Sequence, residues 1–172
     1  GFVNVDAAAA CEPDEVWNLE QTPWPWPDGC ATEVRFIHSL EHMGADSKTF
    51  LAIVCELYRI AAPGCEIVVH VPHPRHDNFI NDPTHVRIVT PGVLSLFDRE
   101  LNDQWQAKGA ANTPLAHYLG VDFKITEVRT VLDDSYRARV QEGAMTEPEV
   151  RAAIAERNNV VAEFRIKLTA RK

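Results

Sequence analysis

The stretch Glu56–Pro72, ELYRIAAPGCEIVVHVP, carries the end of a helix, a Pro-Gly break and a buried strand. Upstream of the break, apolar residues recur at three- and four-residue spacing and form one stripe of an amphipathic helix: Phe50, Leu51, Val54, Leu57, Tyr58 and Ala61. Asp46 or Ser47 can cap its start, and Pro63-Gly64 ends it. Cys65–Pro72 is apolar on both faces, as a central parallel strand is. The pattern predicts an α/β fold.

Earlier in the chain, three further strands are predicted. GFVNVD, Gly1–Asp6, reads as a buried strand that ends in an acid, and shorter runs at Asp14–Glu20 and Thr32–Ser39 have strand character. The proline-rich segment between the last two predicts a loop, because proline removes backbone donors and fixes φ.

Later in the chain, a long polar loop, His73–Pro91, follows the central strand, and a short helix is predicted from Pro91. Two segments, 121–134 and 160–171, alternate apolar and polar residues and predict a pair of antiparallel strands. Between them we expect a helical insert at about 134–158, with a capping box at Thr146–Glu149.

Composition sets broad limits on what the chain does. It has 172 residues, 45% hydrophobic and 24% charged, which fits a single domain, 1–172. The net charge of -8 makes nucleic acid an unfavourable partner. No apolar run reaches the length of about 18 residues that a membrane span needs. Four cysteines without a CxxC pair predict reduced thiols in a cytoplasmic protein. A small apolar stripe on the insert predicts a homo-oligomer contact.

Three segments, in this order along the chain, resemble the class I S-adenosylmethionine-dependent methyltransferases of type 11. GFVNVD resembles the second strand of that family. WPWPDGCATEVRFIHSLEHM, Trp24–Met43, is similar to its fourth-strand region, where H-x-L-E-H follows the strand. ELYRIAAPGCEIVVHVP resembles the helix and Pro-Gly that lead into its fifth strand. The resemblance implies a Rossmann-like, mostly parallel sheet with an antiparallel C-terminal strand pair, and S-adenosylmethionine as the cofactor.

The resemblance also implies a cofactor site at the carboxyl ends of the strands, where open α/β sheets bind ligands. Asp6 would accept hydrogen bonds from the ribose hydroxyls. Asn18 and Leu19 stand at the position that meets adenine, where Asn18 departs from the acid that is common there. His38 and Ser39 would lie under the methionine portion.

One element of the family pattern is absent from the sequence. No G-x-G turn occurs, and the family's first strand, which carries that turn, is central in its sheet. Loss of a central strand would expose two long edges. We therefore expect the domain to be N-terminally incomplete by about one short strand and turn. Otherwise another chain supplies that strand, or the sheet closes differently. We expect cofactor binding by this chain alone to be weak or absent.

The loop after the central strand is rich in histidine and has three interpretations. His70, His73, His76 and His85 with Asp82 could hold zinc or iron, but loop spacing fixes no geometry and we assign no metal ligand. Asp82 could close a structural turn. In the third interpretation the loop contacts substrate, and the predicted roles are as follows. The general base is His73, His76 or His85, and substrate is held by Arg75, Asp82 and Arg87. Glu41 and His42 are interpreted as helix-terminus residues.

These observations predict methyl transfer from S-adenosylmethionine to a small-molecule or sugar-like acceptor. The mechanism would be an in-line transfer in which the protein mainly orients the two reactants. A first alternative is a methyltransferase-like domain without catalysis that serves as a binding or assembly module, which the missing glycine turn favours. A second alternative is a metal-dependent enzyme built on the histidine loop.

Overall fold

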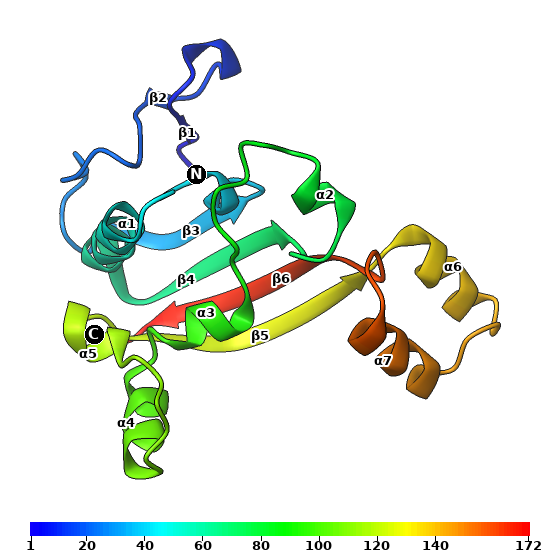
Figure 1. The fold of residues 1–172 in the computed structure, drawn as a ribbon. Coiled ribbons are helices and arrows are strands. Elements are labelled where there is room, and N and C mark those ends of the chain that lie inside the picture. The colour runs from blue at the N-terminus through cyan, green and yellow to red at the C-terminus, as the bar shows by residue number, and fades with distance from the viewer.

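The computed structural model describes residues 1–172 and consists of two sheets and the helices around them (Figure 1). The elements in chain order are β1 (Val5–Asp6), η1 (Ala9–Cys11), β2 (Glu15–Val16), β3 (Ala31–Ile37), η2 (Leu40–His42), α1 (Ser47–Ile60), β4 (Ala61–Pro72), α2 (Asp77–Ile80), α3 (Pro91–Ser95), α4 (Arg99–Ala107), α5 (Leu115–Leu119), β5 (Phe123–Leu132), α6 (Asp134–Gln141), α7 (Glu147–Glu156) and β6 (Val161–Ala170).

The main sheet has four strands in the order β3-β4-β6-β5. β3 and β4 run parallel, and β6 is antiparallel to both β4 and β5, so β6 is the one reversed strand. This arrangement confirms the predicted α/β class with an antiparallel C-terminal strand pair. It also places the carboxyl ends of β3 and β4 at one edge of the sheet, because Ile37 pairs with His70.

One face of this sheet carries the core. α1 lays its apolar stripe on that face through Phe50, Ile53 and Leu57, which pack with Ile67 and Leu168 of the strands. Buried residues of α3 and of the turn after it complete the same cluster. The opposite face is polar along β4 and β6, where the Lys167 Nζ lies 3.1 Å from the Glu66 carboxylate. The sheet is therefore covered by helices on one side.

The amino-terminal strands do not join the main sheet. β1 and β2 form a separate parallel two-stranded sheet, and Figure 1 shows them set apart from β3. The prediction of a buried strand over Gly1–Asp6 is wrong in extent and in burial, since β1 has two residues and the Phe2 and Val3 side chains are 61% and 57% exposed. The physical reason is that the segment pairs only with the short strand β2, and neither Phe2 nor Val3 belongs to the buried core. The Phe2 ring contacts only the Arg35 guanidinium among the charged groups.

Most other predicted elements are present with shifted bounds, but the strand predicted over Asp14–Glu20 is only the two residues of β2. α2 lies within the stretch predicted as a loop, and α5 was not predicted. α1 begins after Asp46, as expected, but ends at Ile60, so β4 starts four residues before Cys65. The capping box at Thr146 and Glu149 is formed at the start of α7. α6 and α7 lie between β5 and β6 and extend from one end of that pair (Figure 1). None of the helices combines the length and the apolar character needed to cross a membrane.

Candidate functional site

The candidate site lies where β3 and β4 end. His38 follows β3 directly, and its N–H donates to the His70 carbonyl of β4 at 2.9 Å. His38 adopts φ +49°, a left-handed conformation that costs a non-glycine residue conformational energy and is found frequently at functional sites. Its imidazole is half exposed, with Nε2 2.9 Å from Glu163 Oε2. The strand end therefore presents an imidazole held in a defined position.

The short helix η2 continues from His38 and buries an acid beneath this edge. Glu41 is 1% exposed, and neither of its carboxylate oxygens has a hydrogen-bond partner. The nearest basic group is His38, whose Nδ1 is 3.6 Å from Glu41 Oε1, too far for a hydrogen bond. The Glu41 carbonyl accepts from the N–H groups of Val86 and Arg87 at 2.9 Å. These two bonds hold the histidine-rich loop against η2.

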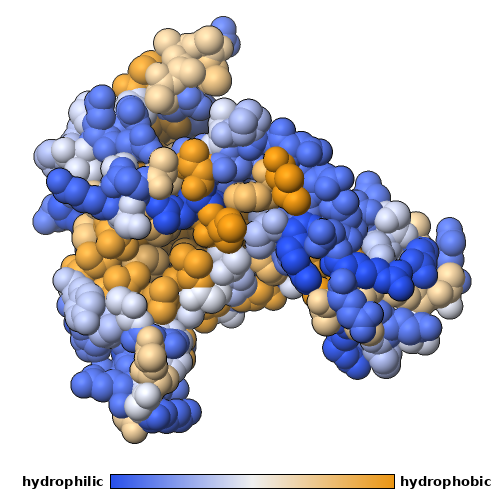
Figure 2. Space-filling view, in the orientation of Figure 1, coloured by the Kyte–Doolittle hydropathy of each residue, from blue (hydrophilic) through white to orange (hydrophobic).

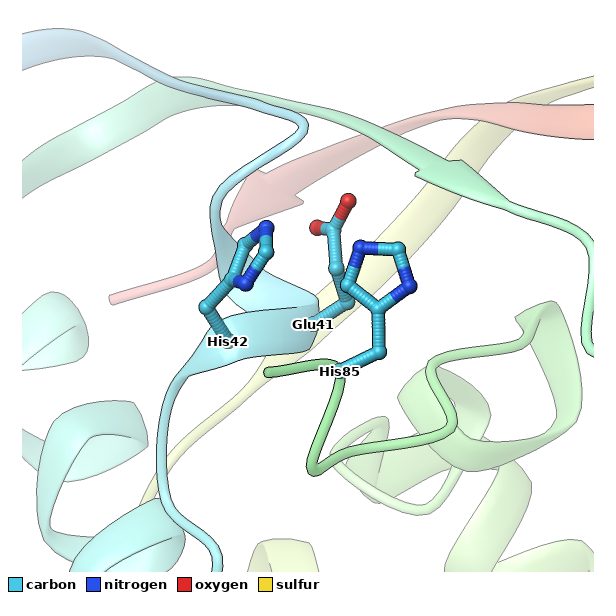
Figure 3. Close-up of side chains that lie close together, drawn as sticks. All are labelled: Glu41, His42 and His85. Atoms are coloured by element: carbon cyan, nitrogen blue, oxygen red, sulfur yellow. The ribbon is translucent and has the colours of Figure 1, made fainter. Parts of the chain in front are cut away.

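The imidazoles of His42 and His85 lie beside the Glu41 carboxylate (Figure 3). His42 and His85 have ring centroids 4.6 Å apart, and His85 stacks on Phe79 with centroids at 5.2 Å. One donor atom from each of Glu41, His42 and His85 lies within 4.8 Å of the other two. Residues from η2 and from the loop between α2 and α3 thus form one cluster of an oxygen and two nitrogen donors.

Asp82 builds the turn that carries this loop. Its Oδ1 accepts from the Thr84 N–H at 2.8 Å and from the Thr84 hydroxyl at 2.6 Å, which is the structural turn foreseen as one interpretation. The hydroxyl bond to Thr84 is the main reason that the pKa of Asp82 is lowered. The Asp82 carboxylate is therefore engaged within its own turn, and its Oδ2 lies 3.8 Å from His85 Nε2.

A second histidine cluster follows β4. His73 Nδ1 accepts from the Arg75 N–H at 3.1 Å, and its ring packs on Phe164. Burial and the nearby Arg75 lower the pKa of His73. His76 is buried; its Nδ1 accepts from the Asn78 N–H at 3.0 Å. Its Nε2 lies 3.3 Å from an Asp133 carboxylate oxygen. Both imidazoles are thus held by the loop that contains them.

The two arginines predicted to hold substrate make contacts within the chain. Arg75 donates to the Ile154 and Ala155 carbonyls at the end of α7. Arg87 donates to the Gly44 carbonyl, with Nε at 3.0 Å, and its guanidinium lies 4.6 Å from the centre of the Phe50 ring. Each guanidinium therefore already stabilises the backbone around the site.

The residues predicted to meet the cofactor fall into two groups. Ser39 adjoins His38 and precedes η2. Asp6, Asn18 and Leu19 belong to the β1–β2 region, and no hydrogen bond links them to the edge formed by β3 and β4. Asp6 Oδ1 accepts from the Ala8 N–H at 2.7 Å, and Asn18 Oδ1 accepts from the Glu20 N–H at 2.9 Å.

The sequence interpretation missed Glu41 and His42 as functional candidates. They do occupy a helix terminus, as predicted, with Glu41 in the first turn of η2. Glu41 and His42 lie close to His85 because the loop between α2 and α3 packs against η2, and no sequence periodicity predicts that contact. The available signal was the H-x-L-E-H pattern directly after a strand, where polar residues gather at the carboxyl edge of an α/β sheet.

The fold is the Rossmann-like α/β fold of the class I methyltransferases. Specifically, the chain is similar to a SAM dependent methyltransferase from Archaeoglobus fulgidus, with a TM-score of 0.59 and 18% identity over 96% of this chain and 74% of that one. It is also similar to the YcgJ protein from Bacillus subtilis, with a TM-score of 0.49 and 12% identity over 98% and 81% of the two chains. At 18% identity the likeness to the first of these structures establishes the fold. No protein-family model and no curated protein sequence matches the chain.

Proposed function

We propose that this chain takes part in methyl transfer from S-adenosylmethionine to a small-molecule acceptor such as a sugar-like alcohol or an amine. The observation that carries the proposal is the main sheet, with parallel β3 and β4 and a single reversed strand, β6, together with its likeness over 96% of the chain to a SAM dependent methyltransferase. The net charge of -8 favours a small acceptor over nucleic acid.

The predicted cofactor residues would contact the ribose, the adenine and part of the methionine portion of S-adenosylmethionine. Asp6 makes no ion pair and spends one oxygen on the Ala8 N–H, so its carboxylate retains acceptor capacity for two ribose hydroxyls. Asn18 is exposed and Leu19 is partly buried, which suits the adenine edge and face. His38 and Ser39 would meet the methionine portion. No glycine-rich turn supplies backbone N–H groups for the methionine carboxylate, so we expect weak binding by this chain alone.

S-adenosylmethionine supplies an electrophilic methyl group on a sulfonium ion. The acceptor oxygen or nitrogen forms the new bond to that carbon, the carbon–sulfur bond breaks and its electron pair goes to sulfur. The protein's part is to align the reactants and remove one proton. Hydrogen bonds occupy the Nδ1 lone pairs of His73 and His76, whereas Nε2 of His85 keeps its own, so His85 is the best of the three predicted bases. We propose that Arg75, Asp82 and Arg87 hold the loop that faces the acceptor.

The surface beside the cluster offers an apolar contact for such an acceptor. Ile80, Val86 and Ile88 are 59%, 42% and 51% exposed on and after α2. Figure 2 shows hydrophobic residues interrupting the hydrophilic surface in this part of the molecule. Val86 directly follows His85, so an acceptor with an apolar part would rest next to the cluster.

Calorimetric titration with S-adenosylmethionine tests the proposal. We expect weak heat of binding that saturates at high cofactor concentration. Asp6→Asn should weaken the affinity at least tenfold because the amide loses the charge that strengthens both ribose hydrogen bonds. The matched control is Asp134→Asn, an exposed acid on α6, which should leave the affinity unchanged.

The second candidate function is a methyltransferase-like module that binds or assembles without catalysis. The separation of β1–β2 from the main sheet is the observation that favours it, because the cofactor site would then lack a continuous sheet beneath it. Absence of any binding heat for the unmodified chain, or equal affinity of the Asp6→Asn variant, would favour this second function over methyl transfer.

A further inference from the structure

The cluster of Glu41, His42 and His85 has the donor set of a metal site. One atom from each residue lies within 4.8 Å of the other two. In Figure 3 the Glu41 carboxylate and the two rings lie together where η2 meets the loop that carries His85. Two imidazoles and one carboxylate recur as protein ligands of zinc and of other divalent transition metals.

The state of Glu41 is the strongest sign that a cation belongs there. A carboxylate that is 1% exposed ordinarily receives hydrogen bonds or an ion pair, because burial removes its hydration. Both oxygens of Glu41 lack any hydrogen-bond partner. No hydrogen bond uses the acceptor capacity of this carboxylate. The His38 imidazole is 3.6 Å away, and donor atoms of His42 and His85 lie within 4.8 Å.

The hydrogen bonds of His42 and His85 involve Nδ1 and leave Nε2 of each ring without a hydrogen bond. Thr84 donates its hydroxyl to Asp82 at 2.6 Å, so its oxygen is free to accept from His42 Nδ1 at 2.9 Å. His85 Nδ1 is 2.9 Å from the Phe79 carbonyl, which can only accept. Both rings therefore carry the proton on Nδ1 and keep a lone pair on Nε2, the arrangement in which a partner on one nitrogen orients the other toward a metal.

We propose that Glu41, His42 and His85 bind a divalent transition-metal ion of the zinc class. Donors of a tetrahedral zinc site stand roughly 3.4 Å apart, so the three side chains need to close by small rotations from their present spacing. The exposed His42 leaves the outer side open to water or an acceptor oxygen. Magnesium is a poorer fit, because it prefers oxygen ligands in octahedral geometry.

The surroundings of His85 support a ligand role. Its side chain is only 8% exposed, stacked on Phe79 and fixed through Nδ1. A ring held in this way suits a metal ligand better than a base that must reach a substrate. Metal binding at Nε2 and proton transfer at Nε2 exclude each other, so in the metal-loaded protein the ion would meet the acceptor oxygen and lower its pKa. Metal binding at this cluster does not depend on whether the chain takes part in methyl transfer.

Metal titration of the intact chain tests the proposal. After treatment with a chelator, the protein is titrated with Zn²⁺ by calorimetry and with Co²⁺ by visible absorption, and Mg²⁺ is titrated in parallel. We expect one equivalent of Zn²⁺ to bind in the micromolar range or tighter. Co²⁺ should give the absorption bands of a site with nitrogen and oxygen ligands, and Zn²⁺ should displace it. Both metals should raise the melting temperature.

Three variants and one control test the ligand assignment. Glu41→Gln keeps the shape of the side chain, and His85→Ala removes a nitrogen; each should weaken Zn²⁺ binding by 100-fold or more. Thr84→Val, which removes the partner of His42, should weaken it about tenfold. The control is His117→Gln, which removes an exposed imidazole next to Asp103 on the other side of the fold, and it should bind Zn²⁺ as the unmodified chain does. Circular dichroism reports whether each variant is folded.

The proposal is overturned if no stoichiometric binding occurs, if Glu41→Gln binds Zn²⁺ as well as the unmodified chain, or if Mg²⁺ binds more tightly than Zn²⁺. These outcomes leave the test of cofactor binding untouched, because that test titrates S-adenosylmethionine and depends on Asp6, which is not one of the proposed metal ligands.

Discussion

At the residue scale, the site is supported by a glycine that the sequence interpretation did not single out. Gly44 follows η2, adopts φ +67°, and donates its N–H to Glu20 Oε1 at 2.6 Å. Its carbonyl receives the Arg87 guanidinium. A Cβ at this position would lie 2.6 Å from Phe50 Cα. Only glycine combines this conformation with so close an approach to α1.

We predict that Gly44→Ala destabilises the protein by about 2–4 kcal/mol, since the new methyl group adds a backbone clash to left-handed strain. The matched control is Gly109→Ala, where φ is +65° but nothing lies within 4 Å of the added Cβ. That change should cost about 1 kcal/mol of strain alone. Urea unfolding measures both free energies. Equal losses for the two variants would show that the contact with Phe50 is unimportant.

At the element scale, α1 shows why a helix could be predicted from its own sequence. The Asp46 carboxylate accepts from the Thr49 N–H at 2.9 Å and from its hydroxyl at 2.6 Å, and the apolar stripe faces β4 and β6. The cap directly precedes the helix and the stripe lies within it, so both signals are local. The Thr49 hydroxyl and amide bonds lower the pKa of Asp46 below its ordinary value near 3.8.

We predict that Asp46→Ala lowers the melting temperature at pH 7 by roughly 2–4 °C, the usual effect of losing an N-cap in a domain of this size. Because the folded pKa is the lower one, the cap's contribution is complete above pH 3.8 and is lost as the pH falls through the folded pKa. Thermal melts from pH 7 to pH 2 should therefore converge for the two proteins. A constant difference down to pH 2 would contradict the prediction.

The extent to which sequence predicts this fold depends on how local each signal is. The helix before β4, the strands β3 to β6 and the capping box of α7 follow from periodicity and capping residues within one segment. The burial of Gly1–Asp6 was predicted wrongly, because burial depends on neighbouring elements that a local pattern does not contain. The same limit hid the contact between His85 and Glu41, which joins residues far apart in the chain.

At the scale of the whole molecule, the main sheet ends at β3 without a further partner. β4 pairs with one side of β3, and the other side has no strand beside it. The N–H of His38 points to β4, so the N–H of Ile37, one residue earlier, points to the open side. An unpaired edge of seven residues is a template for pairing with another chain. It is a different surface from the apolar stripe of the insert, where the sequence predicts a homo-oligomer contact.

We predict that the protein associates reversibly as its concentration rises, through the open side of β3. Ile37→Lys should reduce association at least tenfold, because a charge on an edge strand opposes pairing, and should leave the fold intact, since Ile37 is 47% exposed. Ile80→Lys, at an exposed apolar residue on α2 rather than on β3, serves as the control. Sedimentation velocity across a concentration series measures the effect. A monomer at every concentration, or equal effects of both variants, would contradict it.

The hairpin of α6 and α7 has a consequence for engineering. The strands it joins, β5 and β6, are adjacent and antiparallel, so a turn of two residues would suffice to connect them. Apart from the contacts of Arg75 and His76 with its base, the insert lies beyond the sheet that it interrupts. Its tip is therefore the natural attachment point for a fluorescent label or a fused domain, with the core and the candidate metal cluster left unaltered.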